Sequence, residues 1–303
     1  MAAYPISVLG FGDNVVDKYE HIKTMYPGGN AVNFAVFAKK LGVDRSAYMG
    51  IFGSDEEAEH VIASLEDEGV ELLRCQQVLG VNGAARVTVD ETGDRIFLGS
   101  NEGGIRGDMR YVIDRFAAEY VSGFDLVHSG NYCFTERELP KIKAAGVPIS
   151  FDFSDDSTDE YFGQIAPFVT YAFMSMGDAS LEDIKAKLEW VKALGPQIVC
   201  ASRGSKGSVA YDGENFYEQG IVAYEKAVLA LRRELMGRNL PQLLSYSLGT
   251  SVKQDDFARG ALIADKIFIF GDKHLRDYGD SIEVIESGMF ACAYLDDFDE
   301  EAE

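Results

Sequence analysis

The sequence predicts an α/β fold in which helices flank a central, mostly parallel sheet, with a small additional sheet and a separate α+β segment at the end. Residues 1–220 alternate between short β-branched runs and helical patterns, as parallel strands joined by crossover helices do. Two pairs of closely spaced strand patterns interrupt this alternation and predict β-hairpins. The alternation stops near residue 223, so we place two domains at 1–222 and 223–303.

The first part of the chain contains the clearest elements. Residues 6–10 predict a strand, and the apolar spacing over 30–41 predicts a helix that ends at Gly42. A second strand is expected at 46–51 and a second helix at 55–68. The remaining strands of this part are expected at 126–129, 148–153, 171–174 and 197–201, and its remaining helices at 109–120, 136–145 and 181–194.

The expected hairpins differ from the other elements because a turn sequence, and no helix, joins their strands. One joins 84–89 to 95–98, and the other joins 208–211 to 215–217. Beyond residue 223 a helix pattern ends before Pro241, and short strand patterns follow it. These later elements are a helix at 224–236, strands at 244–252, 266–270, 281–285 and 289–295, and a short helix from Asp255.

The composition places the chain among globular proteins. Of its 303 residues, 47% are hydrophobic and 26% are charged, and no apolar stretch approaches the roughly 20 residues that span a bilayer. The four cysteines lack metal or disulfide spacing and the N-terminus lacks a signal-peptide pattern, so we expect a cytoplasmic protein with reduced thiols. A net charge of −22 repels nucleic-acid phosphates, so we expect no nucleic-acid partner. Because no apolar stretch is long enough to span a bilayer, we also expect no membrane partner.

Paired glycines and asparagines at residues 28–33 form the most informative segment. Gly28 and Gly29 let the backbone pass close to a ligand, because no Cβ intrudes. Asn30 and Asn33 each offer a hydrogen-bond donor and an acceptor, which suits the hydroxyls of a sugar. A glycine turn with an Asn cap at the start of an ordinary helix explains the segment equally well.

Three polar residues, Asp13, Asn14 and Asp17, follow the first expected strand. Ligands of open α/β sheets bind beyond the carboxyl ends of the strands, so these side chains are well placed to contact polyol hydroxyls. The alternative interpretation is a solvated acidic loop.

Two further polar segments also follow expected strands. Asp152 ends one strand, where a carboxylate contacts hydroxyls, organises a metal–phosphate cluster or caps the next helix. The loop after another strand combines serine, glycine and basic residues, namely Ser202, Arg203, Gly204, Lys206 and Gly207. Its backbone N–H groups and cations suit a phosphate, and a tight turn into the second hairpin is the alternative.

Together and in this order, these segments resemble the ribokinase-like (PfkB) family of ATP-dependent sugar kinases over about residues 5–220. The similarity is greatest to the fructoselysine 6-kinase subgroup, on residues 12–19, 28–33 and 151–155. The resemblance implies a ribokinase-like fold with a small β-lid at 84–98 that closes over the sugar and forms a homodimer contact. It also implies ATP and Mg²⁺ as cofactors and a primary hydroxyl of a fructosamine, such as fructoselysine, as the phosphate acceptor.

The resemblance and the motifs together assign residue roles. The substrate-binding residues are expected to be Asp13, Asn14, Asp17, Gly28, Gly29, Asn30 and Asn33. The nucleotide-binding residues are expected to be Asp152, Ser202, Gly204 and Gly207. No metal ligand is assigned, because residues 175–178 do not match the magnesium-linked Asn-x-x-Glu pattern of many members.

One part of the family pattern has no match in this chain. The resemblance implies a Gly-Ala-Gly-Asp segment after the second hairpin, whose aspartate deprotonates the attacking hydroxyl and whose N–H groups stabilise the transferring phosphoryl. No Gly-x-Gly-Asp occurs after residue 220, so no catalytic residue is assigned. Loss of the base costs about 10²–10⁴-fold and loss of the anion hole about 10²–10³-fold more, so we expect a nearly inert kinase whose sheet has an exposed apolar flank.

The end of the chain has a different resemblance. Residues 245–249, 255–257, 264–270 and 285–294 are similar to the first half of the effector-binding domain of MerR-type regulators. We therefore expect a sugar kinase whose C-terminal catalytic third has been replaced, by gene fusion or by an assembly artefact. The alternative is a non-catalytic sugar- or drug-sensing protein, and a third hypothesis is a hybrid that does not fold cooperatively.

Overall fold

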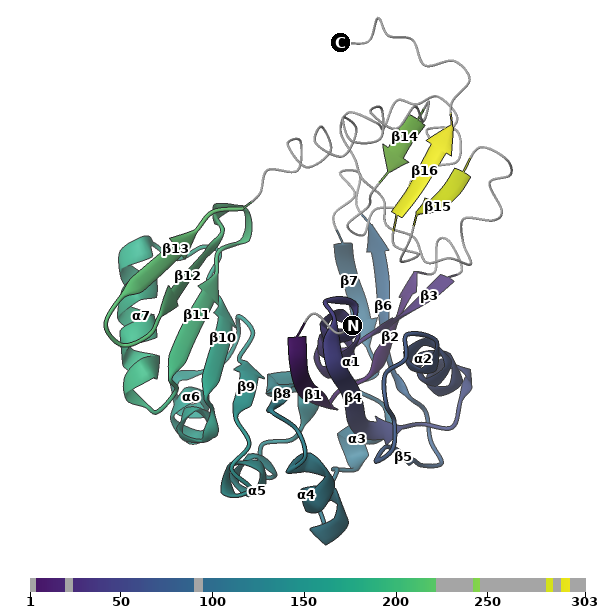
Figure 1. Cartoon of the computed structure of the whole chain (residues 1–303), viewed down its shortest axis with the longest axis horizontal. Coiled ribbons are helices and arrows are strands. Elements are labelled where there is room, and N and C mark those ends of the chain that lie inside the picture. Colours follow the sequence, from purple (N-terminus) through teal and green to yellow (C-terminus); the bar gives the residue numbers. More distant parts are fainter. Residues whose placement is uncertain are drawn as a thin grey trace, which may run out of the picture. The chain divides into compact units, whose positions relative to one another are not determined.

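The computed structural model describes residues 4–19, 24–89, 95–221, 242–245, 282–285 and 290–294 (Figure 1). The chain divides into two units. One holds residues 1–88 and 97–221, and the other holds residues 89–96 and 222–303.

A nine-stranded sheet in the order β13-β12-β11-β10-β9-β8-β1-β4-β5 dominates the first unit (Figure 1). Neighbouring strands from β11 to β5 are parallel, and the antiparallel strands β12 and β13 complete one side. The strands span Tyr4–Gly12 (β1), Val43–Phe52 (β4), Gln76–Gln77 (β5), Leu126–Gly130 (β8), Ile149–Asp152 (β9), Tyr171–Ser175 (β10), Ile198–Ser202 (β11), Ser208–Tyr211 (β12) and Phe216–Gln219 (β13). The carboxyl ends of the parallel strands therefore meet at one edge of the sheet, where α/β proteins bind ligands.

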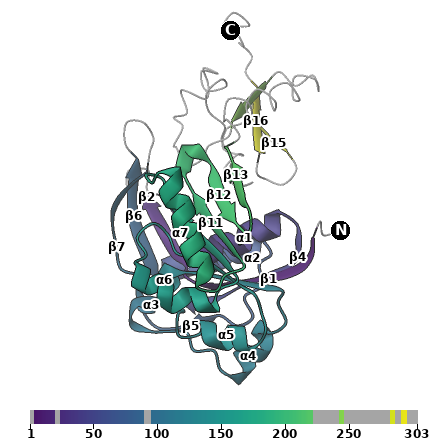
Figure 2. The same cartoon turned by 90° about the vertical axis from the view of Figure 1, so that its left-hand side faces the viewer.

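Helices cover the two faces of this sheet unequally. They span Asn30–Lys40 (α1), Glu56–Asp67 (α2), Ile105–Asp108 (α3), Arg115–Val121 (α4), Leu139–Ala144 (α5), Asp159–Ile165 (α6) and Leu181–Ala193 (α7). On one face, α4–α7 and strand residues such as Leu9, Val127 and Val199 form a core that extends from β4 to β12. Figure 2 shows α7 lying along the strands at the β11–β13 side. On the opposite face, α1 and α2 bury Tyr48 and Phe52 of β4 in a second core. None of the described helices is long and apolar enough to cross a bilayer.

Among the described residues, the core under α1 and α2 does not reach β10–β13 on the face that carries α1. Strand register places Phe173, Cys200, Ala210 and Tyr217 in one row on this face. Phe173 is 41% exposed and Tyr217 is 56% exposed, and neither belongs to a buried core. The exposed apolar flank that the sequence predicts stays a prediction for the whole chain, because nearly all of residues 222–303 lie outside the described residues.

A second, four-stranded sheet has the order β3-β2-β6-β7. Its strands span Val15–Tyr19 (β2), Thr24–Gly28 (β3), Gly83–Val89 (β6) and Arg95–Ser100 (β7). Strand β2 runs antiparallel to β3 and parallel to β6. Because β2 begins just after β1 ends, the short link that carries Asp13 and Asn14 joins the large sheet to the small one.

Most elements expected over residues 1–220 are present, but two expected helices begin too early. The helix expected at 109–120 is replaced by a non-helical stretch and α4, because the Asp114 side chain accepts a hydrogen bond from the Ala117 N–H and caps α4. The helix expected at 136–145 begins only at Leu139. There the Glu138 carboxylate accepts a hydrogen bond from the Ile113 N–H.

The sequence also misses five elements: β2, β3, β5, α3 and α6. The pattern treats residues 13–17 as a loop, because Asp17 and Lys18 interrupt the apolar alternation of β2. That strand forms because both of its edges are paired in the small sheet, which a local pattern does not reveal.

The second unit contains an antiparallel sheet in the order β14-β16-β15. Its strands span Gln242–Ser245 (β14), Ile282–Ile285 (β15) and Phe290–Tyr294 (β16), which overlap three of the expected strands. The elements expected at 224–236, at 266–270 and from Asp255 lie outside the described residues. The domain boundary and the regulator-like resemblance stay predictions.

Candidate functional site

Asp13 holds the start of α1. Its Oδ2 accepts a hydrogen bond from the Asn30 backbone N–H at 2.7 Å, and its Oδ1 accepts one from the Ala31 N–H at 2.7 Å. The Cys133 thiol donates to Oδ1 at 3.1 Å. The N-cap residue Gly29 has φ of 109° and no side chain, so Asp13 supplies from another segment the acceptor that the helix needs. The interpretation of Asn30 as the cap is therefore wrong.

Asn30 connects the helix to two strand ends. Its Nδ2 donates to Asp152 Oδ2 at 2.8 Å, and its Oδ1 accepts from His128 Nε2 at 2.6 Å. His128 Nδ1 lies 2.9 Å from Ser150 Oγ, and the Phe34 ring stacks on the imidazole with centroids 4.4 Å apart. A chain of hydrogen bonds thus runs from β8 and β9 through α1 and fixes the orientation of the Asp152 carboxylate.

Burial sets the protonation of this chain. Desolvation lowers the pKa of His128 to about 4, so the imidazole is neutral at pH 7 and donates through Nε2. Desolvation also raises the pKa of Asp152, and hydrogen bonds from Ser154 and Asn30 oppose that rise. Asp152 Oδ1 accepts from the Ser154 N–H at 2.9 Å, and Thr158 caps α6. The helix-cap interpretation of Asp152 is therefore wrong.

Asn14 is fully buried next to Asp13. Its Nδ2 donates to the Tyr48 hydroxyl at 2.8 Å and to the Ile51 carbonyl at 2.8 Å. The Tyr48 hydroxyl in turn donates to the Gly12 carbonyl at 2.8 Å. Asn14 Oδ1 has no hydrogen-bond partner among the described residues. A buried amide oxygen without a partner is costly, which makes it a suitable acceptor for a ligand hydroxyl.

The other residues expected on the sugar side surround this loop. Gly28 ends β3 close to Asp17 of β2, so that a Cβ on Gly28 would lie 3.6 Å from Asp17 Oδ2. Gly29 approaches the Asp13 carbonyl closely, and a Cβ there would lie 2.8 Å from that oxygen. Asn33 lies in the first turn of α1 with its side chain exposed. Direct contacts bring together one group of the expected residues: Asp13, Asn14, Gly29, Asn30 and Asp152.

The loop after β11 folds into a short 3₁₀ turn before β12. The Arg203 N–H donates to the Gly207 carbonyl at 2.7 Å and closes the loop. Gly204 and Gly207 have φ of 56° and 88°, which favours glycine at both positions. A Cβ on Gly207 would lie 1.9 Å from the Gln219 carbonyl, whereas a Cβ on Gly204 would meet no atom within 4 Å. Gly207 is therefore required by the hairpin, and Gly204 leaves open space above the loop.

Two polar groups of this loop have hydrogen-bonding capacity that the described residues do not use fully. Arg203 Nε is buried without a hydrogen-bond partner among the described residues. Ser202 Oγ donates to Ser175 Oγ at 3.2 Å, so the ends of β10 and β11 present adjacent hydroxyls. An unpaired guanidinium nitrogen beside a glycine loop fits a phosphate-bearing group.

The two groups of residues share one edge and one face of the large sheet. Asp152 of β9 pairs with Phe173 of β10, which pairs with Cys200 of β11. One strand, β10, separates β9 from β11, so their backbones lie about 10 Å apart. Ser202 lies two residues beyond Cys200 in β11, so its side chain is on the same face. The Ser175 N–H donates to the Ser154 carbonyl at 2.9 Å and connects the loops that follow β9 and β10.

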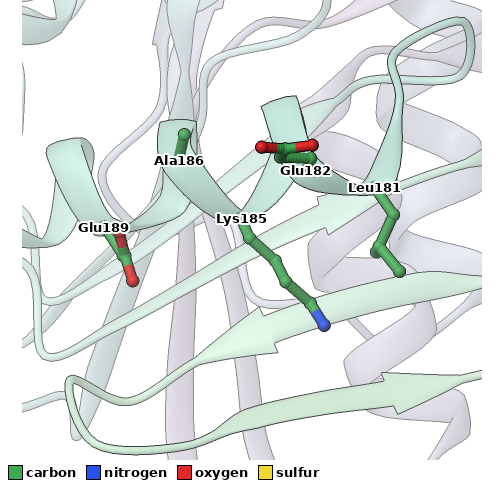
Figure 3. Close-up of a pocket in the computed structure, with 5 residues that line it drawn as sticks. All are labelled: Leu181, Glu182, Lys185, Ala186 and Glu189. Carbon is green, nitrogen blue, oxygen red and sulfur yellow. The ribbon is translucent and has the colours of Figure 1, made fainter.

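The described residues do not provide a metal site. They gather no group of three or more His, Cys, Asp or Glu side chains, so they assign no ligand set to the Mg²⁺ that the family resemblance implies. A surface pocket of about 520 Å³ lies elsewhere, lined by Leu181, Glu182, Lys185, Ala186 and Glu189 of α7 (Figure 3). Since α7 covers the opposite face of the sheet from Asp152, this pocket is separate from the site.

Sequence reasoning does not identify four residues that complete the site: Tyr48, His128, Cys133 and Ser150. His128 and Ser150 are single polar residues inside apolar strand patterns, and this is the signal that distinguishes them. Tyr48 and Cys133 carry no such signal, because their roles depend on contacts between distant segments.

The amino-acid sequence is similar to a known family model and to known sugar kinases. The family model described as pfkB family carbohydrate kinase matches residues 7–228. A fructosamine kinase of Bacillus subtilis (strain 168) is 42% identical over 217 residues, which cover 72% of this chain and 76% of the relative. A fructoselysine 6-kinase of Escherichia coli (strain K12) is 29% identical over 208 residues, which cover 69% of this chain and 77% of the relative.

Solved structures of low sequence identity share the fold. Ribokinase from Giardia lamblia has a TM-score of 0.61 and 18% identity, over 72% of this chain and 76% of that one. Arabidopsis thaliana ribokinase, complexed with ribose and ATP, has a TM-score of 0.57 and 18% identity, over 87% and 92%. The fold is therefore ribokinase-like. Because the family model matches most of the chain and the Bacillus subtilis relative is similar over the same region, this protein belongs to the pfkB family of carbohydrate kinases.

Proposed function

We propose that the ribokinase-like part of this chain binds a fructosamine, such as fructoselysine, next to ATP. The reaction of this site is then phosphorylation of a primary hydroxyl of the sugar. The observation that carries the proposal is the meeting of Asp13, Asn30 and Asp152 at the sheet edge that also holds the glycine loop after β11. The identity to the fructosamine kinase of Bacillus subtilis supports this choice of sugar.

On the sugar side, the free Oδ1 of Asn14 and the exposed Asn33 amide are proposed to contact hydroxyls. Asp17 and Gly28, which lie close together in the small sheet, are proposed to contact the same sugar. Asp13, Gly29 and Asn30 act mainly by positioning: they hold the start of α1 and orient the Asp152 carboxylate. This division follows from which polar atoms are already used in the fold.

On the nucleotide side, Ser202, Gly204 and Gly207 are proposed to hold the ATP phosphates with the Arg203 side chain. The open space above Gly204 and the unpaired Arg203 Nε support this role. Asp152 lies between this loop and the sugar residues in sheet order. When bound, Mg²⁺ would neutralise developing charge on the phosphates.

A second candidate function is sugar binding without phosphoryl transfer. It is favoured by the sequence after Gly220, where no Gly-x-Gly-Asp occurs. A general base and an anion hole together supply about 10⁴–10⁷-fold of rate, so a chain without both binds its sugar but turns it over very slowly. This second candidate includes the proposal that gene fusion joined the kinase part to a different C-terminal segment.

The experiment that separates the two candidates uses the full chain with ATP, Mg²⁺ and fructoselysine. Calorimetry measures sugar binding, and ADP release measures turnover. The primary proposal expects saturable binding with ADP release, whereas binding alone favours the second candidate. Asn33→Ala probes the sugar side directly. Because the exposed Asn33 side chain is proposed to contact the sugar, we expect this variant to bind the sugar more weakly and to keep an intact fold. Failure to bind any fructosamine would overturn both.

We further propose that two copies associate through the small sheet and that the protein acts in the cytoplasm. Phe97 and Leu98 of β7 are 57% and 47% exposed, an apolar surface suited to a second copy. Size measurement in solution tests this proposal, with Leu98→Ser expected to increase the monomer fraction.

The proposed domain boundary at 222/223 is tested by limited proteolysis, which is expected to cut the chain near this position.

A further inference from the structure

Arg106 carries a buried positive charge without an acidic partner in the part of the chain that the structure describes. Its residue surface is 5% exposed, and it forms none of the ion pairs found there. Its one hydrogen bond runs from Nη1 to the Tyr132 carbonyl at 3.3 Å, and its guanidinium lies 5.6 Å from the Phe134 ring centroid. Removing an unpaired cation from water is costly, so an anion that pairs with Arg106 would bind favourably.

The unpaired edge of this guanidinium is the one that matches a carboxylate. Nε is buried without a partner, and Nη2 makes no hydrogen bond to any described residue. Arg45 uses the same edge elsewhere in the fold: its Nε and Nη2 donate to the two carboxylate oxygens of Glu71 at 3.0 and 2.7 Å. Two parallel N–H groups bind a planar carboxylate better than a single contact does.

Arg106 lies near the segment that carries Asn14. A Cβ on Gly83 would lie 2.8 Å from the Asn14 carbonyl oxygen and 3.3 Å from the Gly103 carbonyl oxygen. A Cβ on Gly103 would lie 3.2 Å from Arg106 Nη2 and 3.2 Å from Phe134, the residue after the cysteine that contacts Asp13. Burial raises the pKa of Tyr48, and the nearby charge of Arg106 opposes this rise. Gly103 therefore links Arg106 to the segment whose buried Asn14 Oδ1 is unpaired.

We propose that Arg106 binds the carboxylate of the amino acid that is joined to the sugar. This inference rests on the proposed function and adds to it the residue that selects a fructosamine bearing a carboxylate. Fructoselysine carries such a carboxylate, whereas neutral sugars do not. In a chain of net charge −22, a buried arginine provides the local positive charge that a substrate carboxylate needs.

The test compares two ligands that differ only in the carboxylate: fructoselysine and the fructose conjugate of 1,5-diaminopentane. Calorimetry with the full chain is expected to show at least about tenfold tighter binding of fructoselysine. Arg106→Gln is expected to bind both ligands equally, at the wild-type affinity for the diamine conjugate. Arg110→Gln is the matched control, because Arg110 lies over the same Phe134 ring at 4.3 Å but is exposed, and it is expected to retain the preference.

The outcomes separate this inference from the function on which it rests. Equal binding of the two ligands to the wild-type chain overturns the role of Arg106 and leaves fructosamine binding intact. A preference that persists in Arg106→Gln also overturns it. Binding of neither ligand overturns the proposed function and this inference together. The wild-type comparison does not depend on whether the variant folds.

Discussion

Single polar residues in this site mostly position other residues. Asp13 contacts backbone N–H groups with both carboxylate oxygens, and Asn30 uses both ends of its amide within the protein. The free polar atoms near the site are fewer and lie elsewhere, on Asn14, Arg106 and Arg203. Residue type and spacing mark all of these positions as polar, but only the contacts separate the positioning residues from those available to a ligand.

The cap supplied by Asp13 predicts a stability effect. Asp13→Ala removes the acceptor of two N–H groups at the start of α1, and we expect the free energy of unfolding to fall by about 2 kcal/mol. Urea denaturation measures the change. Asn33→Ala in the same helix turn is the control, with an expected change within about 0.5 kcal/mol. Equal losses in the two variants would contradict the capping role.

His128 predicts a pH dependence of stability. Its folded-state pKa of about 4 lies below the ordinary value of 6.5, so the unfolded chain takes up the proton first as the pH falls. Stability from this group is therefore present above about pH 6.5 and is lost toward pH 4, by on the order of 3 kcal/mol. The neighbouring Asp13 charge acts in the opposite direction to desolvation, as a smaller effect.

Urea denaturation of wild type and His128→Asn between pH 7 and pH 4 isolates this contribution. Other carboxylates, including Asp152, titrate in both proteins and cancel in the difference. We expect the stability difference between the two proteins to shrink as the pH falls. A difference that is constant over this range would exclude a buried, neutral imidazole.

At the scale of elements, the close approach of α1 to β1 places the site. A Cβ on Gly10 would lie 2.1 Å from the Ala31 carbonyl, so only glycine at this position lets the helix lie against the strand. Local patterns locate both elements correctly, but they do not reveal this contact. They fail for β2 and for the stretch before α4, where pairing in the small sheet and the Asp114 cap decide the structure.

Substitution of Gly10 tests this packing. We expect Gly10→Ala to lower the free energy of unfolding by about 1–3 kcal/mol, because the helix must move away from the strand. Gly163→Ala in α6 is the matched control, since no atom lies within 4 Å of the added Cβ. There we expect a gain of up to about 1 kcal/mol from the higher helix propensity of alanine. Chemical denaturation compares the two, and a stable Gly10→Ala protein would refute the packing argument.

At the scale of the whole molecule, the described residues leave one face of the large sheet partly uncovered. The core under α4–α7 extends across most of the sheet, while the core under α1 and α2 includes β4 but no strand from β8 to β13. The site residues His128 and Asp152 lie at the border between the covered and open regions. An open apolar face of this kind promotes association between molecules.

Polar substitutions on the open face test this consequence. We expect the double variant Phe173→Ser, Tyr217→Ser to scatter less light at rising protein concentration and to lose little stability, since both residues are largely exposed. Leu79→Ser provides a comparison, because Leu79 is 91% exposed but lies outside this face. A larger effect from Leu79→Ser would show that the open face is not the cause.

The sequence by itself determined the α/β class, most strands and helices of residues 1–220, the sugar-kinase family and the missing Gly-x-Gly-Asp segment. These features are encoded locally, in hydrophobic periodicity and in short motifs next to strand ends. The tertiary structure alone decided that Asp13 caps α1, that Asn30 joins His128 to Asp152, and that Arg106 is buried without an acidic partner. Burial and hydrogen bonding depend on segments distant in sequence, so no local pattern contains them.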